Sequence, residues 1–338
     1  MAREAAVVGQ SSHFLDALDR ASRAAALDRP VLVIGERGTG KELVAERLHH
    51  LSQRWSAPLV TLNCAALPET LIEAELFGHE AGAFTGAMKA RAGRFEEADG
   101  GTLFLDELAT LSMAAQERLL RAVEYGEVTR IGASRPLKVD VRIVAATNEH
   151  LPDLVDKGRF RADLLDRLSF EVVTLPPLRA RTGDVAVLAD HFGRRMASEL
   201  GWPRWPGFAP AAEAVLADHD WPGNVRELRN VVERAVYRWG DAERPVEALD
   251  FDPFASPWRP AAAPSAPAAP APPAAAAAPE PPCDDLRAAC DAYERRLLQQ
   301  ALARCRFNQR QTAAALSLTY DQLRHALRRH DLLERPPA

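Results

Sequence analysis

Two short segments carry residue types that suit phosphate chemistry, and the first is GERGTGKE, residues 35–42. Its glycines let backbone N–H groups converge on phosphate oxygens, and the helical pattern that follows adds the positive end of a helix dipole. Lys41 would hold the β- and γ-phosphates of a nucleotide. Glu42 stands where Ser or Thr usually supplies a magnesium ligand, which counts against the assignment. The segment predicts a phosphate-binding loop.

The second segment, GGTLFLDE, is an apolar strand pattern that ends in two carboxylates, Asp106 and Glu107. Beside a phosphate-binding loop, such a pair can direct a metal ion and activate the attacking water. The plainer alternative is a solvated acidic end of a strand. Taken together, the two segments favour hydrolysis of ATP.

Further polar residues could act on the same phosphate. Asn148 ends another strand pattern and could orient the γ-phosphate or the water. Arg167 fits two roles equally well, an arginine finger or a helix-surface ion pair with Asp163. Arg226 is predicted in the first turn of a helix capped by Asn224, where a cation is disfavoured unless an anion lies nearby. Bound phosphate would be that anion, and a purely structural arginine is the alternative.

A parallel sheet would bring these residues together. From residue 5 to residue 253, short apolar runs alternate with helical patterns, which is typical of an α/β domain. Residues 182–253 are expected to form an all-helical subdomain within it. The predicted strands are residues 31–35, 59–63, 102–107, 141–148 and 171–175, whose continuous apolar character fits burial on both faces.

The remaining sequence divides into a linker and a basic tail. Residues 254–282 are nearly all Ala and Pro, so we expect a semi-rigid, extended linker. Residues 283–338 carry ten Arg and no Lys against five Asp and two Glu, a charge of +3. Since the whole chain has a formal charge of −5, the remainder carries −8. A basic tail on an acidic body indicates a polyanion partner for the tail alone.

The composition excludes several classes of protein. The chain has 338 residues, 47% of them apolar and 26% charged, as in ordinary globular proteins of roughly two or three domains. No apolar run approaches the roughly 18 residues of a membrane span, and the N-terminus is too polar for a signal peptide. The four cysteines form no C-x-x-C pair and are expected as reduced thiols. We expect a cytoplasmic protein without membrane insertion.

In this order, the motifs resemble the AAA+ domain of bacterial sigma-54-dependent activators, also called enhancer-binding proteins. The family's phosphate loop includes the equivalent of Glu42, which therefore no longer counts against activity. The resemblance implies an α/β P-loop ATPase subdomain at residues 5–181, a helical lid at 182–253, and ATP and Mg²⁺ as cofactors. The other matching segments are LNCAALPETLIEAELFGHEAGAFTGA, GRFEEADGGTLFLDE, FRADLLDRL, LPPLRAR and WPGNVREL.

The resemblance also implies roles for single residues. Asp106 would orient Mg²⁺, Glu107 would activate water, and Asn63 would hold Glu107 in an inactive rotamer until the γ-phosphate is sensed. Arg161 and Arg167 would reach the ATP of a neighbouring subunit, so a ring, most simply a homo-hexamer, would be obligatory. The implied nucleotide-binding residues are Gly35, Glu36, Arg37, Gly38, Thr39, Gly40, Lys41, Glu42, the sensor I residues Thr147 and Asn148, and the sensor II residue Arg226.

Between the two catalytic segments lies GAFTGA, which has no acid, base or metal ligand. Its aromatic ring offers a large apolar contact, and its glycines let the loop change shape; a buried hairpin turn is the alternative. By the resemblance, this loop projects from the pore face of the ring and contacts sigma-54, and residues 130–139 form a second pore loop. The predicted contact residues are Gly82, Ala83, Phe84, Thr85, Gly86 and Ala87.

The tail, residues 283–338, resembles the Fis-type helix-turn-helix of the same activators. Residues 307–331 predict two helices around a turn, with Ser317 in place of the usual glycine, and residues 293–304 suit dimerisation. The second helix would enter the major groove of upstream enhancer DNA; a protein-docking bundle is the alternative. The predicted base contacts are Thr319, Tyr320, Gln322 and Arg324, the phosphate contacts Asn308, Gln309, Arg310, Arg328 and Arg329, and the apolar seam Ala313, Ala314, Leu316, Leu318, Leu323 and Leu327.

The ATPase domain is predicted to begin within a few residues of Met1, so no sensory domain is expected before it and control would come in trans. LHHLSQRW, which ends in Trp55, is similar to members of the family that activate phage-shock genes. In those members a membrane-stress protein, phage shock protein A, inhibits the ATPase. An exposed Trp55 is therefore predicted to receive a phage shock protein A-like inhibitor, and a packed tryptophan is the alternative.

The predicted function is ATP-driven conversion of closed to open promoter complexes of sigma-54 RNA polymerase, with phage-shock genes as targets. One rival is a DNA-binding repressor whose ring only oligomerises in response to nucleotide. A second rival is an unrelated AAA+ remodelling enzyme. The GAFTGA segment argues against both, and the Asp106–Glu107 pair argues against the first.

Overall fold

The computed structural model describes residues 7–84, 86–254, 258, 285–305 and 308–332. The chain divides into two compact units, Met1–Ala255 and Ser256–Ala338, and each is described by itself. Thr85 lies outside the described residues, as does the predicted Ala/Pro linker apart from residues 254 and 258.

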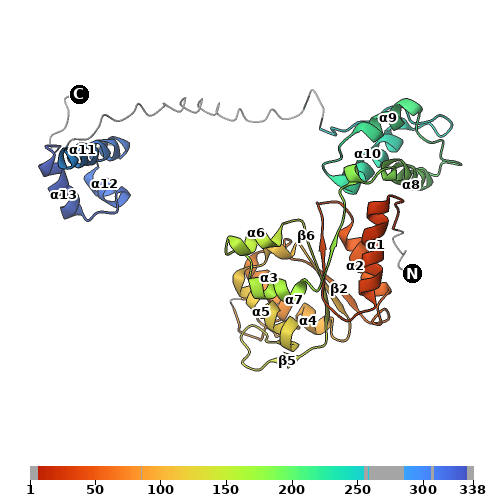
Figure 1. The fold of residues 1–338 in the computed structure, drawn as a ribbon, viewed down its shortest axis with the longest axis horizontal. Helices are drawn as coiled ribbons and strands as arrows, with labels where there is room; N and C mark the ends of the chain where they lie inside the picture. The colour runs from red at the N-terminus through yellow and green to blue at the C-terminus, as the bar shows by residue number, and fades with distance from the viewer. Residues whose placement is uncertain (1–6, 85, 255–257, 259–284, 306–307, 333–338) are drawn as a thin grey trace. The chain divides into compact units, whose positions relative to one another are not determined.

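A five-stranded parallel sheet forms the centre of the first unit (Figure 1), with the strand order β2-β3-β6-β1-β7. The inner strands β3, β6 and β1 are buried over nearly their whole length, because each has a strand on both sides and helices over both faces. All five predicted strands are confirmed. Their bounds are β1 (Val31–Ile34), β2 (Leu59–Asn63), β3 (Thr102–Asp106), β6 (Arg142–Thr147) and β7 (Glu171–Thr174).

Helices cover both faces of the sheet (Figure 1). Successive side chains of a strand point to opposite faces, so Leu32 belongs to one apolar cluster while Val31 and Val33 belong to the other. The cluster of Val31 and Val33 is completed by α1 (Ser12–Ala25) and α2 (Lys41–His50). The opposite side carries α3 (Glu69–Phe77), α4 (Arg94–Glu97), η1 (Leu108–Thr110), α5 (Met113–Tyr125), the hairpin β4 (Glu127–Val128) and β5 (Leu137–Lys138), α6 (Leu151–Asp156) and α7 (Ala162–Leu168).

A helical lid follows the short helix η2 (Leu178–Ala180), as predicted, and contains α8 (Asp184–Glu199), α9 (Pro210–Asp218) and α10 (Asn224–Trp239). Trp221 is fully buried in its core and donates its indole N–H to the carbonyl of Leu216 at 3.0 Å. The predicted cap of α10 is wrong, because Gly223 is the N-cap and Asn224 is the first helical residue. Asn224 has a φ of 54°, a conformation that Asn tolerates. Its side chain does not cap the helix but donates hydrogen bonds to Glu36 and Arg37.

The described part of the second unit contains α11 (Leu286–Arg304), α12 (Gln309–Ala315) and α13 (Tyr320–Arg329). The two helices and the turn predicted for the tail are confirmed, and Ser317 adopts a left-handed φ of 55° at the turn. The predicted seam is only partly right, since Ala314 and Leu318 are exposed. Leu298 and Leu302 of α11 complete the core instead, together with Ala313, Leu323 and Leu327.

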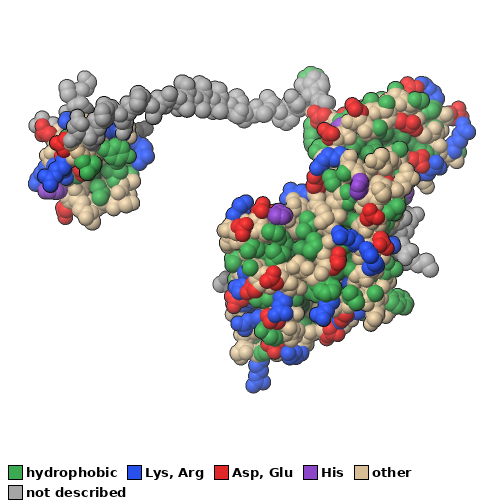
Figure 2. Space-filling model, in the orientation of Figure 1, with side chains coloured by type: hydrophobic (Ala, Val, Ile, Leu, Met, Phe, Trp, Pro, Cys, Tyr) green, Lys and Arg blue, Asp and Glu red, His purple; other side chains and the backbone are tan. Residues whose placement is uncertain are grey.

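Side chains of both charge signs are interspersed on the face of the first unit that Figure 2 shows. That face therefore offers no broad basic surface for a polyanion, in keeping with a basic tail as the nucleic-acid contact. None of the helices in the described part of the chain has the length and apolar character needed to span a bilayer.

Candidate functional site

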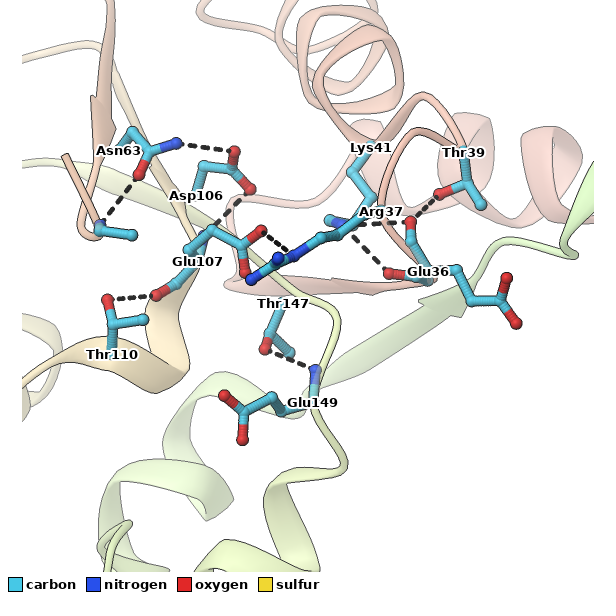
Figure 3. Close-up of polar contacts among 12 residues, drawn as sticks. Glu36, Arg37, Thr39, Lys41, Asn63, Asp106, Glu107, Thr110, Thr147 and Glu149 are labelled. Carbon is cyan, nitrogen blue, oxygen red and sulfur yellow. Dashed lines mark hydrogen bonds and ion pairs between the residues drawn. The ribbon is translucent and has the colours of Figure 1, made fainter. Parts of the chain in front are cut away.

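The phosphate-binding loop runs from the end of β1 to the start of α2. Gly38 and Gly40 have φ values of 78° and 100°, which residues with side chains rarely adopt. A Cβ at Gly38 would lie 2.4 Å from the carbonyl oxygen of Gly223, so this glycine also permits close approach of the lid. Lys41 begins α2, and its Nζ donates to the carbonyl of Gly35 at 3.0 Å (Figure 3). The loop thus has the backbone conformation that phosphate binding requires.

The two predicted carboxylates lie at the carboxyl end of β3, next to this loop (Figure 3). Asp106 is the last residue of the strand, and its Oδ1 accepts the backbone N–H of Glu107 at 3.0 Å. Glu107 has a left-handed φ of 52°, a strained conformation for a residue with a side chain. Its Oε1 lies 3.9 Å from Nε of Arg37, and its side chain is 16% exposed. The turn after β3 therefore directs Glu107 towards the phosphate-binding loop.

The expected contact between Asn63 and Glu107 is absent from this structure. Asn63 Nδ2 donates instead to Asp106 Oδ2 at 3.4 Å, and its Oδ1 accepts the N–H of Ala65 at 2.9 Å (Figure 3). The strand register gives the reason, because Asn63 of β2 pairs with Asp106 of β3 and Glu107 lies one residue beyond the ladder. The expected rotamer contact is thus replaced by a contact with the neighbouring carboxylate.

Thr147 is the last residue of β6, which pairs with β3, and Asn148 follows it. Thr147 is fully buried, and its Oγ1 accepts the N–H of Glu149 at 3.0 Å (Figure 3). Asn148 is partly exposed. Because neither side chain lines the cavity described below, their sensor role stays a prediction.

The charges of the site influence one another. Burial lowers the pKa of Lys41, and the carboxylates of Glu107 and Asp106 oppose that shift. Burial, reinforced by the same carboxylates, raises the pKa of the Cys64 thiol to about 12, so this cysteine is a neutral neighbour. Carboxylate oxygens beside a phosphate-binding loop match the ligand preference of Mg²⁺. Asp106 and Glu107 therefore fit a magnesium ion bound together with a phosphate.

A cavity of about 370 Å³ connects the phosphate-binding loop with the lid, a size that suits a small ligand. One end is polar and is lined by residues 37–42, Asp106, Glu107 and Arg226; Gly35 and Glu36 do not line it. The other end is formed mainly by the apolar side chains of Val7, Val8, Phe14, Leu188 and Phe192, with His191 and Arg195 of α8 also in the lining.

Polar contacts that the sequence did not indicate tie the lid to the phosphate-binding loop. Asn224 Nδ2 donates to Glu36 Oε2 at 3.0 Å and to the carbonyl of Arg37 at 3.1 Å. Arg179 donates to both oxygens of the same carboxylate, at 2.9 and 2.5 Å. Arg179 first and Asn224 second lower the pKa of Glu36 to about 2. Glu36 thus anchors the lid and is not placed to bind phosphate directly.

The two candidate finger arginines lie outside the cavity of their own chain. Arg161 binds Asp163 at 2.7 Å, and Arg167 binds Glu124 at 2.6 Å. The alternative pair between Arg167 and Asp163 is therefore wrong, because Asp163 lies in the first turn of α7 beside Arg161. The side chain of Arg167 is 55% exposed, so a neighbouring subunit can reach it.

The GAFTGA segment is a surface loop, and the alternative of a buried hairpin turn is wrong. Phe84 is 39% exposed, with its ring centroid 5.0 Å from that of His79. Gly82 and Gly86 have φ values of 81° and 102°, and an added Cβ at either would meet nothing within 4 Å. These glycines are therefore needed for the backbone conformation of the loop and not for close packing. Ala87, one of the predicted contact residues, is buried and accepts the N–H of Gly82 at 2.7 Å.

The predicted second pore loop lies beside the first. The N–H of Glu80 donates to the carbonyl of Ile131 at 2.9 Å, and the N–H of Ile131 donates to the carbonyl of Gly78 at 2.9 Å. Arg130 binds Glu80 at 3.1 Å and Glu96 at 2.6 Å. The base of the GAFTGA loop is thus fixed while its tip is exposed.

Trp55 lies in the turn after α2 and is 65% exposed, so the alternative of a packed tryptophan is wrong. The preceding residue holds the turn in place. Arg54 binds the carboxylates of Asp28 and Asp140 at 2.5 and 2.7 Å and the carbonyl of Gly101 at 3.2 Å. An exposed aromatic ring on a fixed turn is a suitable anchor for a protein partner.

Several predicted DNA contacts also stabilise the tail itself. Thr319 is the N-cap of α13, and Gln322 completes its capping box. Asn308 is the N-cap of α12, and its side chain accepts the N–H of Gln311. Arg329 pairs with Asp291 and Glu294 of α11 while its side chain stays 55% exposed, so its phosphate contact stays a prediction. Other exposed side chains that remain for DNA are Arg310, Tyr320, Arg324 and Arg328.

A P-loop, a carboxylate pair and a helical lid define an AAA+ ATPase, and a helix-turn-helix unit adds DNA binding. Residues 7–174 match the Sigma-54 interaction domain, residues 179–256 the AAA+ ATPase lid domain, and residues 291–330 the bacterial regulatory protein, Fis family. The chain belongs to the sigma-54-dependent transcriptional activators.

Known proteins share most of this arrangement. The Psp operon transcriptional activator of Escherichia coli (strain K12) is 52% identical over 327 residues, covering 96% of this chain and 98% of the relative. The NorR regulator of Aeromonas hydrophila is 46% identical over 303 residues, covering 88% of this chain and 58% of NorR. The structure of NtrX from Brucella abortus in complex with ATP has a TM-score of 0.67 at 31% identity, covering 97% of this chain and 70% of NtrX. The chain thus spans nearly all of one relative and a part of the others.

Proposed function

We propose that this ATPase opens promoters held by sigma-54 RNA polymerase and that phage-shock genes are its targets. The observation that carries the proposal is the exposed GAFTGA loop, which shares one compact unit with Lys41, Asp106 and Glu107. The choice of genes is supported by the 52% identity with the Psp operon transcriptional activator.

The reaction follows from the positions of the charged groups. Lys41 and the N-terminus of α2 bind the phosphates at the polar end of the cavity. A magnesium ion held through Asp106 would neutralise charge on the phosphate oxygens. Glu107 lies across the loop from Lys41 and accepts the proton of the attacking water. Arg226 of the lid lines the same end of the cavity. The charge of the bound phosphates therefore affects the position of the lid.

The tail directs the ATPase to upstream enhancer DNA in this proposal. The exposed Arg324 and Arg328 of α13 suit base edges and phosphates in a major groove. Leu286, Tyr293 and Leu297 of α11 remain exposed and offer a surface for dimerisation of the tail.

Promoter opening by the purified chain tests this function. With sigma-54 RNA polymerase and a promoter that carries an upstream site, permanganate reactivity of the melted strand should require the chain and hydrolysable ATP. Deletion of residues 283–338 should reduce opening at low protein concentration and preserve ATP hydrolysis at high concentration. Hydrolysis without opening at any concentration would refute the proposal.

Arg161 and Arg167 are proposed to complete the ATP site of the neighbouring subunit in a hexameric ring. Lys41→Ala subunits lack nucleotide binding and Arg167→Ala subunits lack the finger, so each alone should be inactive. In an equal mixture about a quarter of the head-to-tail junctions regain both groups, and phosphate release should recover accordingly. An arginine that acts within its own chain predicts no recovery on mixing.

Trp55 is proposed to receive a phage shock protein A-like inhibitor. Trp55→Ala should raise the concentration of that protein needed for half-inhibition by about 30-fold, as expected for an aromatic side chain that becomes buried in the interface with its partner. It should leave ATP hydrolysis in the absence of the inhibitor unchanged. Tyr237→Ala is the matched control, because Tyr237 is 66% exposed on the lid. Equal inhibition of wild type and Trp55→Ala would exclude this contact.

A further inference from the structure

A fully buried ion pair at the start of the lid has no part in the chemistry described above. Arg181 Nε donates to Asp184 Oδ2 at 2.7 Å, and the two side chains are 2% and 0% exposed. Arg181 is the C-cap of the short helix η2, and Asp184 is the first residue of α8. Burying two charges is costly, and an apolar pair of similar volume often stabilises a protein at least as well. The pair therefore calls for a role beyond stability.

Asp184 holds the N-terminal segment of the ATPase unit. Its Oδ1 accepts the backbone N–H groups of Gln10 at 2.6 Å and Ser11 at 2.9 Å. Ser11 is in turn the N-cap of α1 and accepts the N–H of Phe14. A carboxylate of the lid thus fixes both the path of the chain before α1 and the start of that helix.

Arg181 holds the same segment from the other side of the ion pair. Its Nη2 donates to the carbonyl of Val8 at 3.3 Å, and its guanidinium carbon lies 3.7 Å from the centre of the Phe14 ring. A Cβ at Gly9 would lie 2.6 Å from Phe14 Cδ1, 2.7 Å from Arg181 Nη2 and 2.8 Å from Asp184 Oδ2. Only a residue without a side chain lets the segment lie this close to the pair.

The ion pair joins the two walls of the apolar end of the cavity. Val7, Val8 and Phe14 form one wall, on the N-terminal segment and α1. Leu188 and Phe192 are the apolar part of the other wall, on lid helix α8, which also contributes His191 and Arg195. Arg181 itself lines the cavity between them. A charged contact therefore links the two walls directly.

We propose that Arg181 and Asp184 are positioning residues that set the width of this apolar end and thereby the affinity and selectivity for the nucleobase of ATP. The inference rests on the proposed nucleotide site. Because the polar end of the cavity binds the phosphates there, we assign the apolar end to the base of the same nucleotide. The hydrogen bonds and ion pair of Arg181 and Asp184 go to Val8, Gln10, Ser11 and each other and not to residues 35–42 of the phosphate-binding loop, so we expect their effect to be confined to ligands that carry a base.

Binding of two ligands separates this role from a purely structural one. The double variant Arg181→Met/Asp184→Asn removes both charges together and leaves no unpaired buried ion. Its dissociation constant for ATP should rise by about tenfold, the cost of ordering one or two loosened side chains, and its preference for ATP over GTP should fall. Its dissociation constant for inorganic tripolyphosphate should stay within about twofold, since the polar end is untouched.

Two further variants complete the test. Arg23→Met/Asp19→Asn removes an exposed pair on α1 and should change neither constant. Arg181→Lys keeps the charge but lacks the second nitrogen that donates to Val8, and it should show a smaller loss confined to ATP; it serves as the test if the double variant does not fold. Equal losses for ATP and tripolyphosphate, or unchanged ATP binding in a folded variant, would overturn the proposal. Promoter opening does not enter these measurements, so failure of the proposed polymerase function would leave their result standing.

Discussion

Glu107→Gln should bind ATP with nearly unchanged affinity and lose about 10²- to 10⁴-fold in kcat, the range expected when a general base is removed. The glutamine keeps the size and packing of a side chain that is 16% exposed, but it cannot accept a proton from water. Phosphate binding depends on Lys41 and the loop backbone, which this change leaves intact. Fluorescent-nucleotide titration and phosphate release measure the two effects separately.

Glu149→Gln is the matched control for this experiment. Glu149 follows β6 at the same edge of the sheet (Figure 3), yet it does not line the cavity. Its substitution should change kcat by less than about twofold, as expected for a surface site. A Glu107→Gln enzyme with wild-type turnover would show that another group activates the water. Loss of binding comparable to that of Lys41→Ala would show that Glu107 supports the loop instead.

The parts of the site that lie close together in sequence were predictable. Glycine spacing and the strand-loop-helix context are local signals, so the phosphate-binding loop and its flanking elements agree with expectation. The strands were also predictable, because burial on both faces gives continuous apolar runs such as Val31–Ile34. Residue types alone left Arg167 and Arg226 with two roles each, and the family resemblance supplied the preferred one.

Contacts between distant segments were not predictable from the same signals. Asn224 looked like a helix cap, and nothing near it in sequence shows that its amide reaches Glu36, 188 positions away. The apolar positions of α11 fitted a dimer interface, but Leu298 and Leu302 pack inside their own unit. Periodicity identifies an apolar face and not the surface that covers it. The expected contact between Asn63 and Glu107 is absent for a similar reason. The strand register pairs Asn63 with Asp106, so its amide binds that carboxylate.

Phe84→Ala should abolish promoter opening while ATP hydrolysis continues. The ring is exposed at the tip of a loop whose base is fixed by backbone hydrogen bonds to Ile131, and none of the described residues of the loop lines the nucleotide cavity. Truncating an aromatic anchor in an interface commonly costs 2 kcal/mol or more, so opening should fall by at least about 30-fold. Phosphate release should stay within about twofold, because the change is distant from the reacting groups.

Met88→Ala separates loss of this contact from a general effect on the loop. Met88 is 90% exposed just beyond the GAFTGA residues, so its truncation removes a larger accessible side chain from the same region. If opening depends on a specific aromatic contact with sigma-54, Met88→Ala should open promoters nearly as well as the wild type, because exposed side chains outside an interface core contribute little. If Phe84→Ala instead loses hydrolysis and opening in parallel, the ring acts through its packing on His79. The loop would then support the structure of the ATP site and would not act on the polymerase.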